Sequence, residues 1–178
     1  MIVPVVAWHE EHVYFTLLLH MLQKELDLFR DAGLPNYALM QDIVSYLRDY
    51  GDEYHHPRED EAFRRMLPRC PELALELARL QQEHAVIAHA GEALSAHLEA
   101  IGSGALVPRA QVEAAAATYL VYYRNHLMRE EEEVLTRATQ VLTEEDWEAI
   151  RQCAPAGGEP GRGLEHYREL RRRIALEA

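Results

Sequence analysis

Apolar residues recur every three or four positions through most of this chain, which is the spacing of amphipathic helices. The first such stretch runs from Val5 to Phe29 and ends before Asp31, Gly33 and Pro35, so we expect a helix there. His12 is a polar residue at a core position of the apolar stripe, which consists of Val5, Trp8, His12, Phe15, Leu19, Leu22 and Leu26.

A second stretch starts after Pro35-Asn36 and ends at Pro68, with Pro57 in its interior. An interior proline removes one backbone hydrogen bond. We therefore expect this helix to kink or restart beside His55 and His56. The stripe includes Met40, Val44, Leu47, Gly51, His55, Glu59, Ala62 and Met66.

Two further long helices follow. Pro71 opens the third, whose stripe continues to Ile101 and carries His84 at a core position, and Pro108 opens the fourth, which continues to Val141. Thr143 is expected to cap a short helix anchored by Trp147.

The pattern predicts an all-α fold. Within residues 1–150 we expect an antiparallel up-down four-helix bundle, because four long amphipathic helices are joined by short connections. A break at residues 155–161 precedes a terminal helix from Leu164 to Ala175. Residues 151–178 are therefore expected to form a short C-terminal helical appendage, packed on the same domain.

Two short sequence motifs indicate a metal site. His55 and Glu59, and likewise His126 and Glu130, are four residues apart, so each pair shares one face of a helix. With His12 and His84 on the stripes of the other two helices, four imidazoles and two carboxylates converge on one axis. Uncompensated buried charge destabilises a fold by several kcal/mol per ion, roughly. A metal site, with two ions, would compensate it.

Neighbouring residues compete for some of these positions. His56 and Asp60 have the same spacing, but only His55 and Glu59 continue the stripe back through Leu47, so His56 is expected beside the site or at its mouth. Glu131 lies about 100° further round the helix than Glu130. Whether His56 with Asp60, or Glu131, replaces a chosen ligand stays open. The remaining histidines are expected in solvent: His9, His20, His89, His97 and His166.

Composition excludes several classes of protein. With 48% hydrophobic and 27% charged residues among 178, the chain is typical of one globular domain, and its net charge of -12 disfavours nucleic acid and anionic membranes as partners. Cys70 and Cys153 lack CxxC spacing, and no apolar run approaches the roughly 18 residues of a membrane span. We expect a cytoplasmic location. The HExxH motif of zinc proteases is absent. The Glu-x-x-His motif occurs once, whereas ferritin-like di-iron bundles need it on two helices, so the pattern does not fit that class.

The sequence resembles the hemerythrin-like, or HHE cation-binding, family over roughly residues 5–150. Four stretches carry the resemblance: Glu11-His12, Tyr54-His55-His56-Pro57-Arg58-Glu59-Asp60, Glu83-His84, and His126-Leu127-Met128-Arg129-Glu130-Glu131. Family members are four-helix bundles with two iron ions bridged by two carboxylates and an oxo or hydroxo group. The resemblance implies six ligands here: His12, His55, Glu59, His84, His126 and Glu130.

The resemblance to oxygen-carrying hemerythrins is incomplete. Their fifth histidine, one turn after the third-helix ligand, is replaced by Ala88, and their last carboxylate spacing would select Glu131. The set is more similar to the iron-centre repair and nitric-oxide-responsive branch of the family.

Imidazole with carboxylate suits iron, with manganese or zinc as possible substitutes. We consider three functions: binding or sensing of O2, NO or peroxide, reduction of peroxide or NO with an electron donor, and iron storage or donation to an acceptor protein. Whether the chain is an enzyme is left open. The oligomeric state is not predicted.

Overall fold

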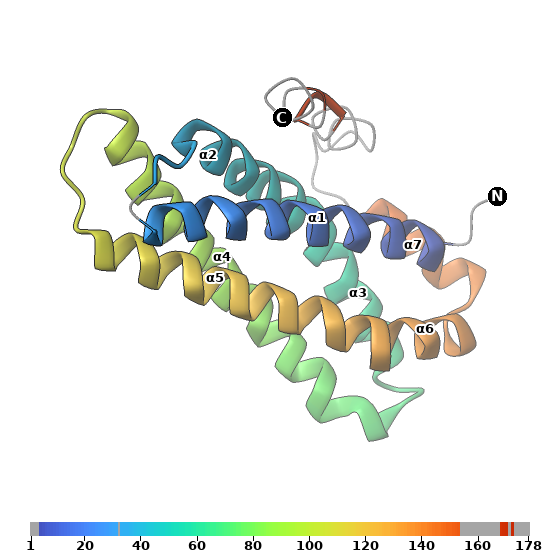
Figure 1. Cartoon of the computed structure of the whole chain (residues 1–178). Coiled ribbons are helices and arrows are strands. Elements are labelled where there is room, and N and C mark those ends of the chain that lie inside the picture. The colour runs from blue at the N-terminus through green and yellow to red at the C-terminus, as the bar shows by residue number, and fades with distance from the viewer. Residues whose placement is uncertain (1–3, 32, 154–167, 171, 173–178) are drawn as a thin grey trace.

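The computed structural model describes residues 4–31, 33–153, 168–170 and 172, and this part of the chain contains helices and connections but no strand. Four rods make up most of it (Figure 1). Their helices, in chain order, are α1 (Pro4–Arg30); α2 (Tyr37–Tyr46), η1 (Leu47–His55) and α3 (His56–Met66); η2 (Pro71–Leu73) and α4 (Ala74–Gly102); and α5 (Arg109–Arg129), η3 (Glu130–Val134) and α6 (Leu135–Val141). The short helix α7 (Glu144–Gln152) follows.

The rods pack as neighbours around a shared interior. The first contacts the second and the fourth, through α2 and α5, and α4 contacts both α2 and α5 (Figure 1). The expected helix boundaries at Pro71, Ile101 and Val141 agree with these elements to within a few residues. The prediction of an all-α fold is therefore confirmed for the described residues.

The short helix at the end of the four rods forms as the sequence predicts. Thr143 accepts a hydrogen bond from the backbone N–H of Asp146, and Asp146 accepts one from the backbone N–H of Thr143, which is a capping box. Trp147 is buried against Trp8. Most of the predicted terminal helix, Leu164 to Ala175, lies outside the described residues. Within it, Leu170 is buried in a hydrophobic cluster that also contains Phe15 and Leu47.

Two hydrophobic clusters fill the interior. One includes Phe15, Leu47, Ile87 and Tyr123, and the other includes Trp8, Ala62, Leu80 and Val134. Each rod contributes to both clusters, and successive rods meet the two clusters in opposite order along the sequence. Between the two clusters each rod carries buried polar residues, which include His12, His55, His84 and His126.

Two of the rods contain a stretch of π-helix, which the sequence pattern did not predict. In η1, the backbone N–H of His56 bonds to the carbonyl of Gly51, and in η3 that of Leu135 bonds to the carbonyl of Glu130. These five-residue bonds widen the helix, a feature frequent at functional sites. The restart expected near Pro57 takes this form, because α3 begins at His56 and places Pro57 in its first turn, where a missing N–H is tolerated.

Candidate metal centre

All six residues predicted as ligands lie in the polar layer between the two hydrophobic clusters. None is more than 7% exposed: His12, His55, Glu59, His84, His126 and Glu130. Donor atoms of His12, His55, Glu59 and Glu130 lie within 4.8 Å of one another, and so do donor atoms of His56, Glu59, His84 and His126. The structure thus brings the predicted residues together in two groups that share Glu59, and it adds His56.

The histidines face each other in two pairs. The Nε2 atoms of His12 and His55 are 3.0 Å apart, and those of His84 and His126 are also 3.0 Å apart. Two neutral imidazole nitrogens at this distance, both with lone pairs directed inward, would repel each other. A cation or a proton between them removes that repulsion, so each pair is arranged for positive charge.

Both carboxylates lie between the two pairs. Glu59 Oε1 is 2.8 Å from His55 Nε2, and Glu59 Oε2 is 3.5 Å from His84 Nε2. Glu130 Oε2 is 3.2 Å from His126 Nε2 and 3.6 Å from His12 Nε2. Both oxygens of Glu130 and Oε2 of Glu59 are buried without a hydrogen-bond partner among the described residues. Buried charged oxygens without a partner strongly destabilise a fold, and metal ions would satisfy them.

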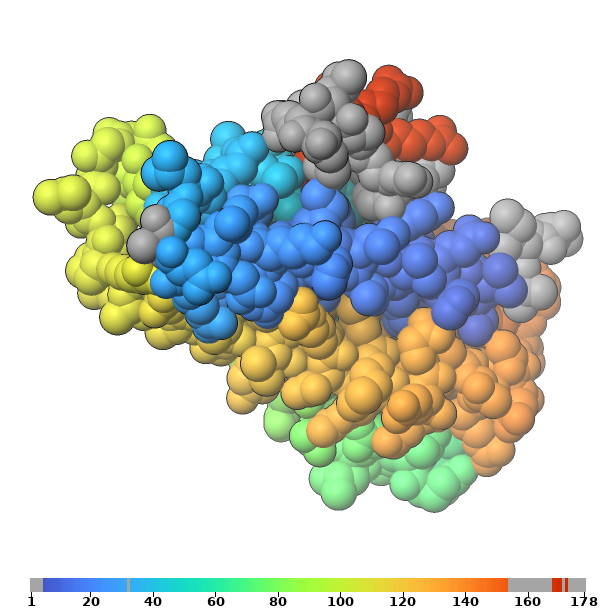
Figure 2. Space-filling view, viewed as in Figure 1, coloured from blue at the N-terminus to red at the C-terminus, as the bar shows by residue number. Residues whose placement is uncertain are grey.

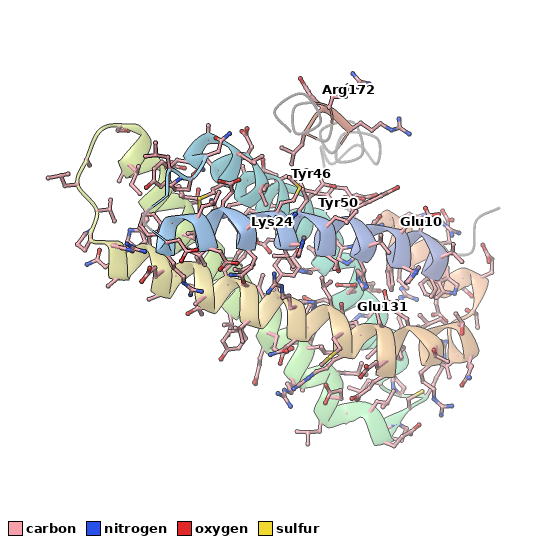
Figure 3. All side chains as sticks on the ribbon, in the orientation of Figure 1. Glu10, Lys24, Tyr46, Tyr50, Glu131 and Arg172 are labelled. Atoms are coloured by element: carbon pink, nitrogen blue, oxygen red, sulfur yellow. The ribbon has the colours of Figure 1, made fainter. Side chains whose placement is uncertain are left out.

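The outer nitrogen, Nδ1, of each of these histidines faces a carboxylate from another rod. Glu11 of the first rod is 2.5 Å from His55 Nδ1, and Asp60 of the second is 3.0 Å from His84 Nδ1. The third and fourth rods close the ring: Glu83 is 3.4 Å from His126 Nδ1, and Glu131 is 2.7 Å from His12 Nδ1. Figure 3 shows Glu131 on the fourth rod beside α1.

These outer carboxylates determine which ring nitrogen faces inward. A carboxylate accepts a hydrogen bond from Nδ1–H, which keeps the proton on Nδ1 and leaves the lone pair on Nε2, and this arrangement is usual for histidines that bind metals. Because each rod supplies the carboxylate for the next, the ring also holds the four rods in register.

This ring of outer carboxylates was not predicted, although the sequence contains a signal for it. Glutamate directly precedes His12 and His84, and an acidic residue directly follows Glu59 and Glu130. One residue of each doublet faces the centre, and its neighbour contacts the adjacent rod. Glu131, expected to lie off the stripe, is half-buried and bonds His12, as well as His9 at the surface.

His56 lies deeper than the sequence predicted. It was expected beside the site or at its mouth, but it is only 3% exposed, and its ring stacks on His84 with 4.2 Å between ring centroids. The π-helical turn of η1 ends at His55, and both histidines are buried where α3 begins. Of the histidines predicted in solvent, His9, His20 and His89 are exposed, His97 is half-buried, and His166 is outside the described residues.

The electrostatics of the centre match this arrangement. Burial lowers the pKa of an imidazole, yet Glu131 and Glu59 raise the pKa of His12 to about 10. Burial raises the pKa of a carboxyl, yet the histidines hold the pKa of Glu59 well below 4.5. For His56, burial together with His84 holds the pKa well below 6.5, so this imidazole is neutral.

A groove leads from the surface to the centre. It has a volume of about 620 Å³ and opens between α1 and the α5–η3 segment, on the face seen in Figure 2, reaching His12 and Glu131. Much of its lining is apolar: Val13, Leu17, Leu127 and Met128. A small, weakly polar molecule can therefore approach the His12 side of the centre.

Comparison with known proteins agrees with this geometry. No curated protein matches the chain. No described helix is long and apolar enough to cross a membrane. The Hemerythrin HHE cation binding domain family matches residues 3–138, well over half of the 178 residues. The chain therefore belongs to the hemerythrin HHE cation-binding family, whose domain binds metal cations, and its buried histidine and glutamate cluster is compatible with such a site.

Proposed function

We propose that this protein is a non-haem di-iron protein that binds or senses a small ligand such as O2, NO or peroxide. The observation that supports it most is the pairing of histidine nitrogens at 3.0 Å on both sides of two buried carboxylates. Such a set of donors, closed from solvent on most sides, suits two adjacent cations.

We assign the ligands by proximity. His12 and His55 would hold one ion, and His84 and His126 the other. Glu59 and Glu130 would lie between the two ions, because each approaches histidines of both pairs. The reversed order in which successive rods meet the two hydrophobic clusters supports an antiparallel up-down four-helix bundle around this centre.

Iron is the proposed metal because imidazole and carboxylate donors suit it. Manganese accepts the same donors and zinc accepts imidazole, so both are possible substitutes. Cys70 is buried and Cys153 is exposed, and neither is in a group of metal donors, so no thiolate favours a softer metal within the described residues.

The residues of the chain prepare the centre for such a ligand. The outer carboxylates fix the orientation of the imidazoles, and the rings of Phe15 and Trp8 pack against His55 and keep water away. When bound, a pair of iron ions supplies redox chemistry and open coordination positions. The apolar groove that reaches His12 gives a small ligand access to that side.

The test is an optical titration of the iron-loaded protein under anaerobic conditions with NO, and separately with O2 and peroxide. We expect new absorption bands that saturate with added ligand and are absent from His126→Ala protein under the same conditions. Repeated turnover with an added electron donor would favour an oxidoreductase. Iron release to an acceptor, without any spectral response to these ligands, would contradict the proposal and favour iron storage or donation.

A further inference from the structure

The buried ring of His56 has a nitrogen that no group in the described part of the chain satisfies. Its Nε2 atom is enclosed without a hydrogen-bond partner, although the residue is only 3% exposed. Buried polar atoms without a hydrogen-bond partner are rare and call for an explanation. An apolar side chain at the same position would avoid the unsatisfied nitrogen. Leu127, which follows His126 as His56 follows His55, is such an apolar side chain.

The two nitrogens of His56 repeat the arrangement of the other histidines in the centre. Its Nδ1 atom lies 3.3 Å from a carboxylate oxygen of Asp52, one turn earlier in the same rod. His12, His55, His84 and His126 likewise place Nδ1 against a carboxylate and Nε2 toward the interior. An imidazole with a carboxylate beside Nδ1 and with Nε2 directed inward has the placement of a metal ligand.

The position of His56 assigns it to one side of the centre. One of its ring nitrogens lies within 4.8 Å of donor atoms of Glu59, His84 and His126. Its ring is parallel to that of His84, at an interplanar angle of 11°, and nearly perpendicular to that of His126. The group around His12 and His55 contains no corresponding third histidine.

We propose that His56 is a fifth histidine ligand, which binds through Nε2 the ion held by His84 and His126. This assignment rests on the proposed two-ion centre. It makes the centre unequal, with three histidines on one ion and two on the other. The ion with fewer histidines is then the one beside His12, which is the side that the groove reaches.

The experiment uses the full-length protein loaded with Co²⁺ and its proton NMR spectrum in water. Each cobalt-bound imidazole that keeps its Nδ1–H gives a strongly shifted, exchangeable signal. We expect one such signal more than the four from His12, His55, His84 and His126. The extra signal should be absent from His56→Phe, which keeps an aromatic ring to stack on His84, and present in His89→Ala, which changes an exposed histidine.

A second readout is the affinity of each Co²⁺ ion, measured by competition with a chelator. His56→Phe should lower the affinity for one of the two ions by at least about tenfold. Removal of a residue that only hydrogen-bonds to a metal ligand already lowers metal affinity by about ten- to a hundredfold. The unmodified protein alone already tests the count, so the outcome does not depend on the variant folding.

The outcomes separate the two proposals. Two bound ions with only four shifted signals, unchanged in number in His56→Phe, would overturn the role of His56 and leave the two-ion centre intact. Failure of the unmodified protein to bind two ions would overturn the centre itself. Two ions with five signals, falling to four in His56→Phe, is the expected result.

Discussion

The Glu11 carboxylate offers a direct test of the outer ring, because it joins three partners. It accepts hydrogen bonds from His55 Nδ1 at 2.5 Å, from Arg58 Nη2 at 2.7 Å and from the Tyr50 hydroxyl at 2.8 Å. The side chains of Glu11 and Arg58 are only 15% and 10% exposed. Although burial raises the pKa of Glu11, His55 and Arg58 lower it below the ordinary value. The carboxylate is therefore charged in the folded protein.

Glu11→Gln keeps the shape of the side chain and removes its charge. Loss of one partner from a buried ion pair destabilises a fold by about 3–5 kcal/mol. We expect the lower end, about 3 kcal/mol, because the glutamine keeps one oxygen that can accept a hydrogen bond from Arg58. For a chain of this size, that corresponds to a fall of roughly 6–12 °C in melting temperature. The affinity for the ion beside His55 should also fall, by about ten- to a hundredfold.

The matched control is Glu10→Gln, which removes the same charge from the neighbouring position on α1 (Figure 3). Glu10 is exposed, so its replacement should change the free energy of unfolding by less than about 0.5 kcal/mol. The assay is urea unfolding of both metal-free variants, followed by circular dichroism, together with metal titration against a competing chelator. Equal stabilities and equal metal affinities for the two variants would refute the role given to the outer ring.

Three further predictions concern packing, pH and metal. In Gly51→Ala the new Cβ would collide with the Tyr123 hydroxyl, so we expect the free energy of unfolding in urea to fall by about 1–3 kcal/mol. The control Gly102→Ala, where the Cβ meets open space, should not lower it. A Gly51→Ala protein that is more stable than the unmodified protein would contradict this. Arg69 holds the pKa of Asp146 below its ordinary 3.8, so this carboxylate stabilises the fold above that pH. The loss of unfolding free energy in Asp146→Asn, relative to the unmodified protein, should therefore shrink as the pH falls below about 4. A loss that is independent of pH would count against this role. Removing metal with a chelator should lower the melting temperature. Relative to protein at a free metal concentration a hundredfold above Kd, the free energy of unfolding should fall by about 2.7 kcal/mol. Equal melting temperatures with and without metal would exclude this linkage.

The sequence was sufficient for the rods and for the six central residues. Three-four spacing fixes which face of a helix is buried, and a histidine or glutamate on that face must be buried too. Because His12, His84, and the pairs from His55 and His126 all fall on such faces, their convergence follows from helix geometry alone.

Two features depended on geometry that regular spacing does not contain. The π-helical turns at residues 47–55 and 130–134 change the rotation per residue, so a helical wheel drawn at 100° per residue does not show that His56 is buried beside His55. The outer carboxylates contact a histidine of a neighbouring rod, and the spacing within one helix cannot show which side faces that neighbour. Spacing within one helix therefore left the role of Glu131 open, and the structure shows that it contacts His12 across the rods.

The central claim is that the buried residues of all four rods hold two ions together. The most direct measurement is the iron content of protein purified under anaerobic conditions, beside His126→Ala and Glu130→Ala purified in the same way. We expect two irons per chain in the unmodified protein and a sharp fall in both variants. Protein that takes up no iron, or variants that retain as much as the unmodified chain, would contradict the account.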